Sequence, residues 1–221
     1  MSATPDPQAE SVGCCIRCRK PIEMCICGAL ARHQSRLFVL VLRHPQEKDR
    51  VLGTARLIEL QLPQSRIATG LSWRNLEAAL GKPAHPQDWA ALFQGPKTDR
   101  PQRGAAPVIA VDRRGSPLPD QRAALAGIRG VIALDGNWSQ AKTLWWRNPW
   151  LLKCRRLVLN PARPSAYGTL RREPRRDSLS TLEAVALTLS ALENDAALYE
   201  RLTAPLSKLV ETAGQAGQAP I

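Results

Sequence analysis

One stretch of the sequence, residues 130–142, constrains the fold more than any other. It opens with Gly130 and four consecutive apolar residues, two of which are β-branched. Such a run predicts a strand that is buried on both faces, as parallel strands in α/β domains are. The run stops at Asp135, so the sequence places a carboxylate at the carboxyl end of an interior strand.

A helix is predicted directly after this acid. Asn137 and Gln140 have the spacing of a capping box, and apolar residues recur at helical spacing from Trp138 until Asn148. Asp135 therefore lies beside the positive end of a helix, and such corners bind ligands in open α/β sheets. The alternative is that Asp135 only accepts hydrogen bonds from backbone donors in a tight turn.

Further apolar runs predict more strands, with helices between them. The strands are expected at residues 36–42, 67–70, 107–112 and 154–160. The helices are expected at 49–62, 73–80, 86–93 and 120–127, then from residue 180 and again after residue 204. This alternation predicts an α/β fold, a layered sandwich with a mostly parallel sheet.

Two polar side chains near the predicted strand and helix ends have both a structural and a catalytic interpretation. His44 follows the strand at 36–42 and is either an ordinary hydrogen-bonding residue or a catalytic one. Ser180 and Glu183 match a second capping box, which explains both residues without a catalytic role for Glu183.

Length and composition allow one α/β domain with a small appendage. The chain has 221 residues, and no stretch approaches the roughly 20 apolar residues of a membrane span. We expect a disordered lead at 1–13, a zinc-binding knuckle at 14–30, a catalytic domain at 31–213 and a frayed tail at 214–221. Because the first thirty residues contain no apolar signal segment, we expect a cytoplasmic protein.

Five of the six cysteines are clustered near the start of the sequence, which favours metal ligation over disulfides in a cytoplasmic chain. Cys15 and Cys18 form one pair, Cys25 and Cys27 form the other, and together they can surround one Zn²⁺ with sulfur. With no open position, such a metal is structural. Cys14 is the surplus thiol. The second pair is tighter than usual, so free or redox-active thiols and an Fe–S cluster stay open as alternatives.

The net charge of +12 favours an anionic partner, above all nucleic acid. Residues 153–176 carry eight basic side chains against one acid, Glu173. We expect this segment to bind RNA phosphates near the Asp135 corner; the alternative is a solvated basic face. The RNA-binding candidates are Lys153, Arg155, Arg156, Tyr167, Arg171, Arg172, Arg175 and Arg176.

Taken in order, these separated motifs resemble the DTW-domain family, the tRNA-uridine aminocarboxypropyltransferases. The resemblance covers most of the chain: the cysteine pairs and the segments 44–47, 130–141, 164–167 and 179–184. Asn137 stands where the family's Asp-x-Thr-Trp motif has threonine, so a contact that needs a hydroxyl group is lost. The arginine that follows the family's loop tyrosine corresponds to either Arg171 or Arg172.

This resemblance implies a SPOUT-like fold with a trefoil knot that holds S-adenosylmethionine. It also implies transfer of the donor's 3-amino-3-carboxypropyl group to N3 of a uridine in tRNA, which gives acp-uridine and methylthioadenosine. We hypothesise that three loops hold the donor, through Leu134, Asp135, Gly136, Asn137, Asn160, Pro161, Ser180, Thr181, Leu182 and Glu183.

Asp135 and Trp138 are the expected catalytic residues. Asp135 serves either as the base for uridine N3 or as the anchor of the donor's amino group. Trp138 either stacks on a base or is the first core residue of its helix. Rival interpretations are an RNA methyltransferase that uses the same donor, a related enzyme acting on rRNA, and a zinc-containing RNA-binding protein without catalysis. The oligomeric state stays open, with a monomer favoured.

Overall fold

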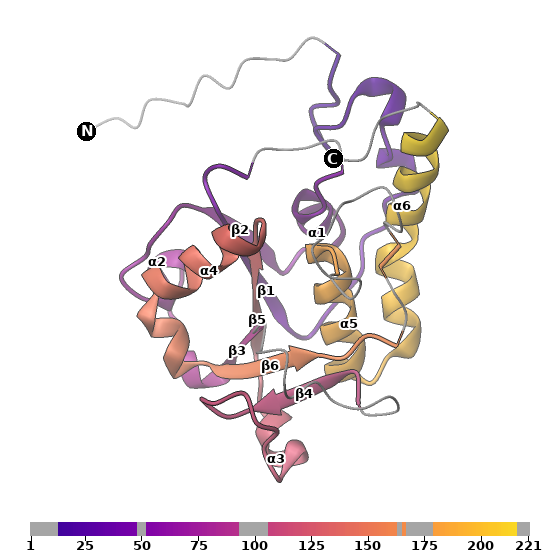
Figure 1. Ribbon diagram of the computed structural model, residues 1–221. Helices are drawn as coiled ribbons and strands as arrows, with labels where there is room; N and C mark the ends of the chain where they lie inside the picture. The colour runs from indigo at the N-terminus through magenta and orange to yellow at the C-terminus, as the bar shows by residue number, and fades with distance from the viewer. Residues whose placement is uncertain (1–12, 48–51, 93–105, 163–164, 167–178, 216–221) are drawn as a thin grey trace, which may run out of the picture.

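The apolar run that ends at Asp135 forms an interior strand, β5, of a six-stranded sheet. The strand pairs in parallel with β1 on one side and β3 on the other, and Val131 and Ile132 are fully buried. The computed structural model (Figure 1) describes residues 13–47, 52–92, 106–162, 165–166 and 179–215.

The sheet has the strand order β2-β1-β5-β3-β6-β4. The strands are β1 Phe38–Arg43, β2 Ser65–Thr69, β3 Trp89–Leu92, β4 Val108–Val111, β5 Gly130–Asp135 and β6 Arg155–Leu159. All neighbouring pairs are parallel except β4 and β6, which are antiparallel at one edge. The predicted mixed α/β fold with a mostly parallel sheet is confirmed.

Helices cover both faces of this sheet. Helices α1 Ala55–Gln61, α5 Thr181–Glu193 and α6 Ala196–Gln215 pack on one face, and α2 Leu76–Leu80 and α4 Trp138–Arg147 pack on the other (Figure 1). The alternation of side chains along β1 divides the two cores, since Val39 and Val41 join the first and Leu40 and Leu42 the second. A short helix, α3 Gln121–Leu125, lies beside β4. The 3₁₀ helices are Ile22–Met24, Cys27–Ala29, Pro86–Asp88 and Pro149–Lys153.

The prediction of a helix at residues 86–93 is wrong. Only Pro86–Asp88 is helical, and the chain then enters β3, an interior strand of the sheet. A run as short as this one has no periodicity that separates strand from helix. The neighbouring strand makes room for it: a Cβ atom on Gly130 would lie 2.5 Å from the ring of Trp89.

The helix expected after residue 204 begins eight residues earlier, as α6 at Ala196. Asn194 ends α5 in the left-handed conformation, and Asp195 accepts a hydrogen bond from the backbone of Leu198 in the first turn of α6. Pro205 lies inside α6. In a helix that began after residue 204 this proline would occupy the first position, where proline is common, whereas here it is an interior residue.

None of the helices within the described residues is both long enough and apolar enough to cross a membrane. The trefoil knot stays a prediction, and most of the chain between β6 and α5 lies outside the described residues. The expected lead at 1–13 lies almost entirely outside them too.

Candidate active site and metal centre

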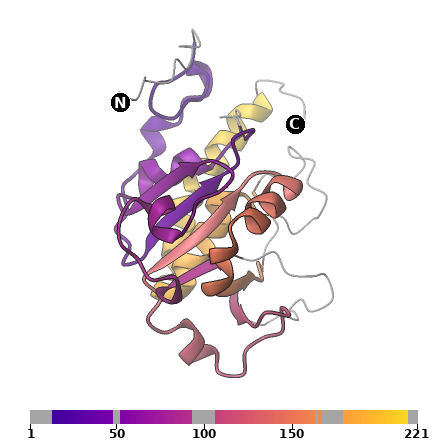
Figure 2. The same ribbon diagram turned by 90° about the vertical axis from the view of Figure 1, so that its left-hand side faces the viewer.

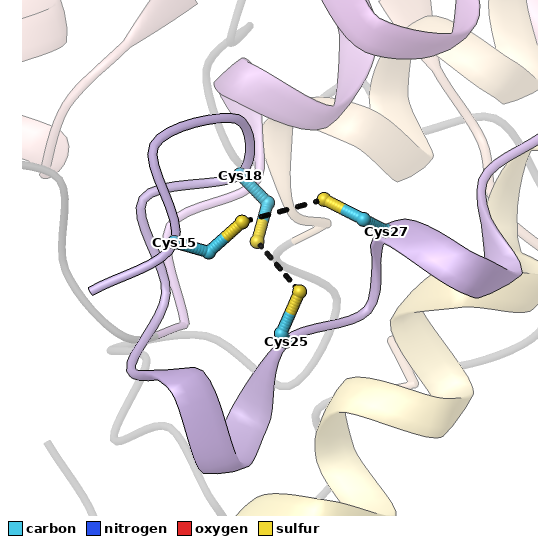
Figure 3. A group of neighbouring side chains, drawn as sticks. All are labelled: Cys15, Cys18, Cys25 and Cys27. Carbon is cyan, nitrogen blue, oxygen red and sulfur yellow. Dashed lines mark hydrogen bonds between the residues drawn. The ribbon is translucent and has the colours of Figure 1, made fainter. Parts of the chain in front are cut away.

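Four cysteine sulfur atoms converge in the knuckle near the start of the chain (Figure 3). The Sγ atoms of Cys15, Cys18, Cys25 and Cys27 all lie within 4.8 Å of one another. The Cys15–Cys27 and Cys18–Cys25 sulfur distances are 3.6 and 3.8 Å. A tetrahedral zinc ion with Zn–S bonds of about 2.3 Å requires sulfur atoms roughly 3.8 Å apart. The cluster could therefore hold a metal ion, and it consists of the four cysteines that the sequence selected.

The backbone around the first pair prepares a thiolate. Arg19 adopts a left-handed conformation, with φ of 56°, and the backbone N–H of Cys15 donates to the carbonyl of Lys20. Backbone N–H groups of Cys18 and then Arg17 donate to the Cys15 sulfur and lower its pKa from 9.0 to about 6. Because metals bind the deprotonated sulfur, this turn favours metal binding.

The knuckle is fixed to the α/β domain by buried contacts. Met24 and Ile26 belong to the same core as α5 and α6. Lys20 is 2% exposed, and its ammonium group donates to the carbonyl of Gly53, just before α1. The Arg56 guanidinium on α1 donates to the carbonyl of Arg17 at 3.1 Å.

Asp135 lies at the carboxyl edge of the sheet, held by two side chains. Arg43, its partner in the β1–β5 register, donates from Nε to Asp135 Oδ2 at 2.9 Å. The Thr181 hydroxyl, at the start of α5, donates to Oδ1 at 2.7 Å. The carboxylate is 8% exposed. These side-chain donors do not fit the alternative in which Asp135 only satisfies backbone donors.

The turn after Asp135 leads directly into α4. The predicted capping box is confirmed: Asn137 accepts from the Gln140 backbone, and the Gln140 side chain accepts from the Asn137 backbone. Gly136 has φ of 155°, and a Cβ atom there would lie 2.8 Å from Cβ of Gln140. Only glycine fits this turn, which places the amino end of α4 beside Asp135.

The second predicted capping box, at the start of α5, is also confirmed, and its Glu183 side chain makes further contacts with the segment after β6. Glu183 is fully buried, and its Oε2 accepts from the Ser180 backbone at 2.8 Å. The same oxygen accepts from the Ser165 hydroxyl, and Oε1 accepts from the Ala166 backbone, both at 2.7 Å. Glu183 thus ties the segment after β6 to the start of α5, and its carboxylate is occupied by these donors.

These contacts connect the three loops that the sequence selected. The loop after β5 joins the start of α5 through Asp135 and Thr181, and the segment after β6 joins it through Glu183. Asn160 and Pro161 follow β6, where the Asn160 backbone donates to the Pro107 carbonyl.

Three of the selected side chains, those of Leu134, Leu182 and Trp138, differ in how deeply they are buried. Leu134 is partly buried at the end of β5, whereas the Leu182 side chain is fully buried in the core and can only shape the site from behind. Trp138 is 45% exposed, so its interpretation as a core residue is wrong: the first position of α4 faces outward.

The sequence prediction missed Arg43 and Thr54. Arg43 becomes a partner of Asp135 only through the parallel register of β1 and β5. The signal in the sequence was that the apolar runs that form β1 and β5 end in residues of opposite charge, Arg43 and Asp135. Thr54 accepts a hydrogen bond from the Leu182 backbone at 3.3 Å. His44 is 7% exposed, and its Nδ1 accepts from the Gln46 backbone, which matches the ordinary interpretation. The His44 backbone N–H donates to the Asp135 carbonyl, so this residue lies next to the corner.

The described part of the predicted basic surface does not lie at this corner. Lys153 and Arg155 precede or begin β6, and the strand register sets Arg155 level with Val131, four residues before Asp135. Arg155 donates to the carbonyl groups of Gln87 and Ala124.

Arg156 is similarly engaged within the fold. It is 9% exposed and donates to the Arg113 carbonyl at 2.9 Å. Arg155 and Arg156 line a shallow hollow of about 430 Å³ between β4, β6 and α3, at the amino end of β6. The other candidates, Tyr167, Arg171, Arg172, Arg175 and Arg176, lie outside the described residues.

Comparison with known proteins agrees with this arrangement of motifs. The chain is 28% identical over 201 residues to tRNA-uridine aminocarboxypropyltransferase 2 of Drosophila melanogaster, covering 88% of this chain and 72% of the fly protein. Proteins of the same name from Macaca fascicularis and Mus musculus are 28% identical over 200 residues, covering 88% of this chain and 61% of each relative. No solved structure matches. The family model of the DTW domain matches residues 12–213, and the chain therefore belongs to the DTW-domain family.

Proposed function

We propose that this protein transfers the 3-amino-3-carboxypropyl group of S-adenosylmethionine to N3 of a uridine in tRNA. The observation that carries the proposal is the Asp135 corner, where a buried carboxylate lies between two helix starts in a DTW-domain chain. The names of the relatives support the activity. Because the chain spans only about three fifths of the mammalian relatives, the activity, tRNA as the partner and a cytoplasmic site of action are all proposals.

The charges of the corner are complementary to those of the donor's amino acid portion. The amino ends of α4 and α5 favour a negative group such as the donor carboxylate, and Asp135 favours its ammonium group. The residues proposed to contact the donor are Leu134, Asp135, Gly136, Asn137, Asn160, Pro161, Ser180 and Thr181. Leu182 and Glu183 support them from the core.

The contacts of Asp135 support its role as anchor over its role as base. One oxygen already accepts from Arg43 and the other from Thr181, and these two contacts hold the carboxylate in one orientation. A carboxylate has about four acceptor sites, so the donor's amino group can add to these two contacts. In this role Asp135 orients the donor; Trp138, exposed next to the corner, is proposed to stack on the incoming base.

Orientation decides which group is transferred. The sulfonium of S-adenosylmethionine can donate its methyl group or its longer amino acid chain, according to which carbon faces the nucleophile. In the proposed reaction a bond forms between uridine N3 and the chain carbon attached to sulfur, the carbon–sulfur bond breaks, and the N3 proton leaves. When its amino acid portion is anchored at the amino end of α4, the donor presents that carbon to the RNA.

We further propose that the cysteine cluster holds a structural Zn²⁺. Four sulfur ligands at tetrahedral spacing fit zinc and leave no position for substrate. An Fe–S cluster would absorb visible light. A zinc site would show no visible absorption, and metal analysis would find one zinc per chain. A SPOUT-like knot around the donor is part of the same proposal, since the start of α5 contacts the end of β5.

The test incubates the full chain with S-adenosylmethionine and an unmodified tRNA transcript. We expect equal amounts of methylthioadenosine and of a uridine carrying the aminocarboxypropyl group, identified by mass spectrometry. A methylated nucleoside with S-adenosylhomocysteine would identify an RNA methyltransferase instead. RNA binding without any calorimetric signal for the donor would identify a non-catalytic RNA-binding protein.

A further inference from the structure

Helix α4 exposes a face of tryptophan and lysine side chains. Trp146 is 72% exposed, Trp138 is 45% exposed, and Lys142 between them is also exposed. The three residues are spaced by four, so they follow one side of the helix. The core side of α4 is formed by Ala141 and Leu144. Large exposed aromatic side chains of this kind are informative, because most large apolar residues are buried.

This face begins at the proposed active site and leads away from it. Trp138 is the first residue of α4, three positions after Asp135, and Trp146 lies eight residues further along. At 1.5 Å per residue, the two tryptophans are about 12 Å apart along the axis. Figure 2 presents the α4 layer in front of the sheet, on the side opposite α5 and α6.

The segment of the chain that contains this face carries charge of one sign. No acidic residue occurs in the sequence from Gly136 to Arg172, although this segment contains eight basic residues. Lys142 and Arg147 on α4 and Lys153 after it are exposed. On the same helix, the Arg156 guanidinium lies 5.5 Å from the centre of the Trp145 ring, a cation–π contact.

We propose that this face, defined by Trp138, Lys142 and Trp146, binds the unpaired strand around the reacting uridine: Trp138 stacks on the uridine itself and Trp146 on a flanking nucleotide. Tryptophan rings stack on base faces, which only unpaired nucleotides present, and the lysine binds the phosphate between them. A duplex offers phosphates but hides its base faces, so it would bind this surface only through the charge of the lysine. The inference rests on the proposed function, because that function supplies the RNA.

The test measures RNA affinity by fluorescence anisotropy, with an unmodified tRNA transcript and with a blunt RNA duplex. Trp146→Ala should raise the Kd for tRNA about tenfold, the effect of losing one stacked base. Trp146→Phe should keep most of the affinity. The duplex Kd should stay unchanged in Trp146→Ala, since no base face is available to the ring.

The salt dependence of tRNA binding separates the contribution of the lysine charge from that of tryptophan stacking. Lys142→Gln should lower the slope of log affinity against log salt by about 0.8 for tRNA, whereas Trp146→Ala should leave the slope unchanged. The matched control is Lys208→Gln on α6, an exposed lysine beyond the opposite face of the sheet, which should change neither value.

The outcomes distinguish this inference from the proposed function. If the wild-type chain modifies tRNA while Trp146→Ala binds tRNA with unchanged Kd, the inference is wrong and the function stands. If the chain transfers nothing but Trp146→Ala weakens tRNA binding as expected, the surface stands without the function. A concentration-dependent dimer that Trp146→Ala converts to a monomer, with tRNA affinity unchanged, would assign the face to self-association and overturn the inference.

Discussion

The cysteine cluster and the Asp135 corner are assembled in different ways. All four clustered sulfur atoms come from residues 15–27, and a single left-handed turn at Arg19 helps to shape the first pair. The corner takes Arg43, Asp135 and Thr181 from three distant parts of the chain. The cluster therefore depends mainly on local spacing, whereas the corner exists only when two strands are in register and α5 has docked. A point change at the corner should thus leave the cysteine cluster intact.

The largest expected effect is at the cluster. Cys25→Ser should reduce bound zinc from one per chain to almost none and destabilise the fold by several kcal/mol, because structural zinc supplies folding free energy. Metal analysis and thermal denaturation measure both changes. Cys14→Ser is the matched control, since Cys14 is not among the four ligands. Full zinc content in Cys25→Ser would contradict the assignment.

The next effect concerns the corner. Asp135→Asn should lower the rate of transfer to tRNA about 100-fold, because a misplaced donor reacts slowly, and should leave zinc content unchanged. Arg43→Gln should act in the same direction, and the double variant should lose less than the sum of the two, since both changes remove one ion pair.

Asp120→Asn serves as the control for that charge change, because Asp120 caps α3 and asparagine keeps the cap. Additive effects of Arg43→Gln and Asp135→Asn would show that the ion pair does not act as a unit.

A smaller effect isolates the third member of the corner. Thr181→Val removes the hydroxyl that donates to Asp135, a bond to a charged group that is worth about 1.5 to 3 kcal/mol. Calorimetry should give a Kd for S-adenosylmethionine that is roughly ten times higher. Thr181→Ser, which keeps the hydroxyl, should bind nearly as well as the wild type; equal loss in both variants would point to packing instead.

The smallest effect is a dependence of stability on pH that belongs to neither site. Burial, and then the nearby charge of Arg201, lowers the pKa of His33 below its ordinary value of about 6.5. The unfolded chain therefore binds this proton more readily, so stability should fall as pH drops below about 6.5 and level off below the folded pKa. His33→Gln should flatten the curve of Tm against pH between about 5 and 7.5, by a few degrees at most. An unchanged curve would remove His33 from the account.

The same contrast explains what could be predicted from the sequence. Both capping boxes and the clustering of the four cysteines are local patterns, and each was identified from spacing alone. Strand β3 was missed because a short apolar run fits strand or helix until its neighbours are known. Arg43 was missed because only strand register brings it to Asp135.

The basic segment shows a related difficulty. Arg155 and Asp135 both lie in strands of one sheet, but β6 begins where β5 also begins, so the arginine lies toward the other end of the strands. Sequence proximity to the loop after β6 suggested otherwise. Trp138 was given a core alternative because its helical spacing matched Ala141, although the first turn of α4 extends beyond the sheet edge.

The docking of the knuckle has a consequence for how the molecule melts. Met24 and Ile26 share one apolar core with α5 and α6, and Lys20 is bonded to the segment that leads, through Thr54, to the start of α5. The knuckle has no separate interior with which to unfold alone. Chelation should therefore lower the Tm of a single cooperative transition of the whole chain, and loss of one small ion from the knuckle should also disassemble the contact between Asp135 and Thr181, which lie far from the knuckle in the sequence.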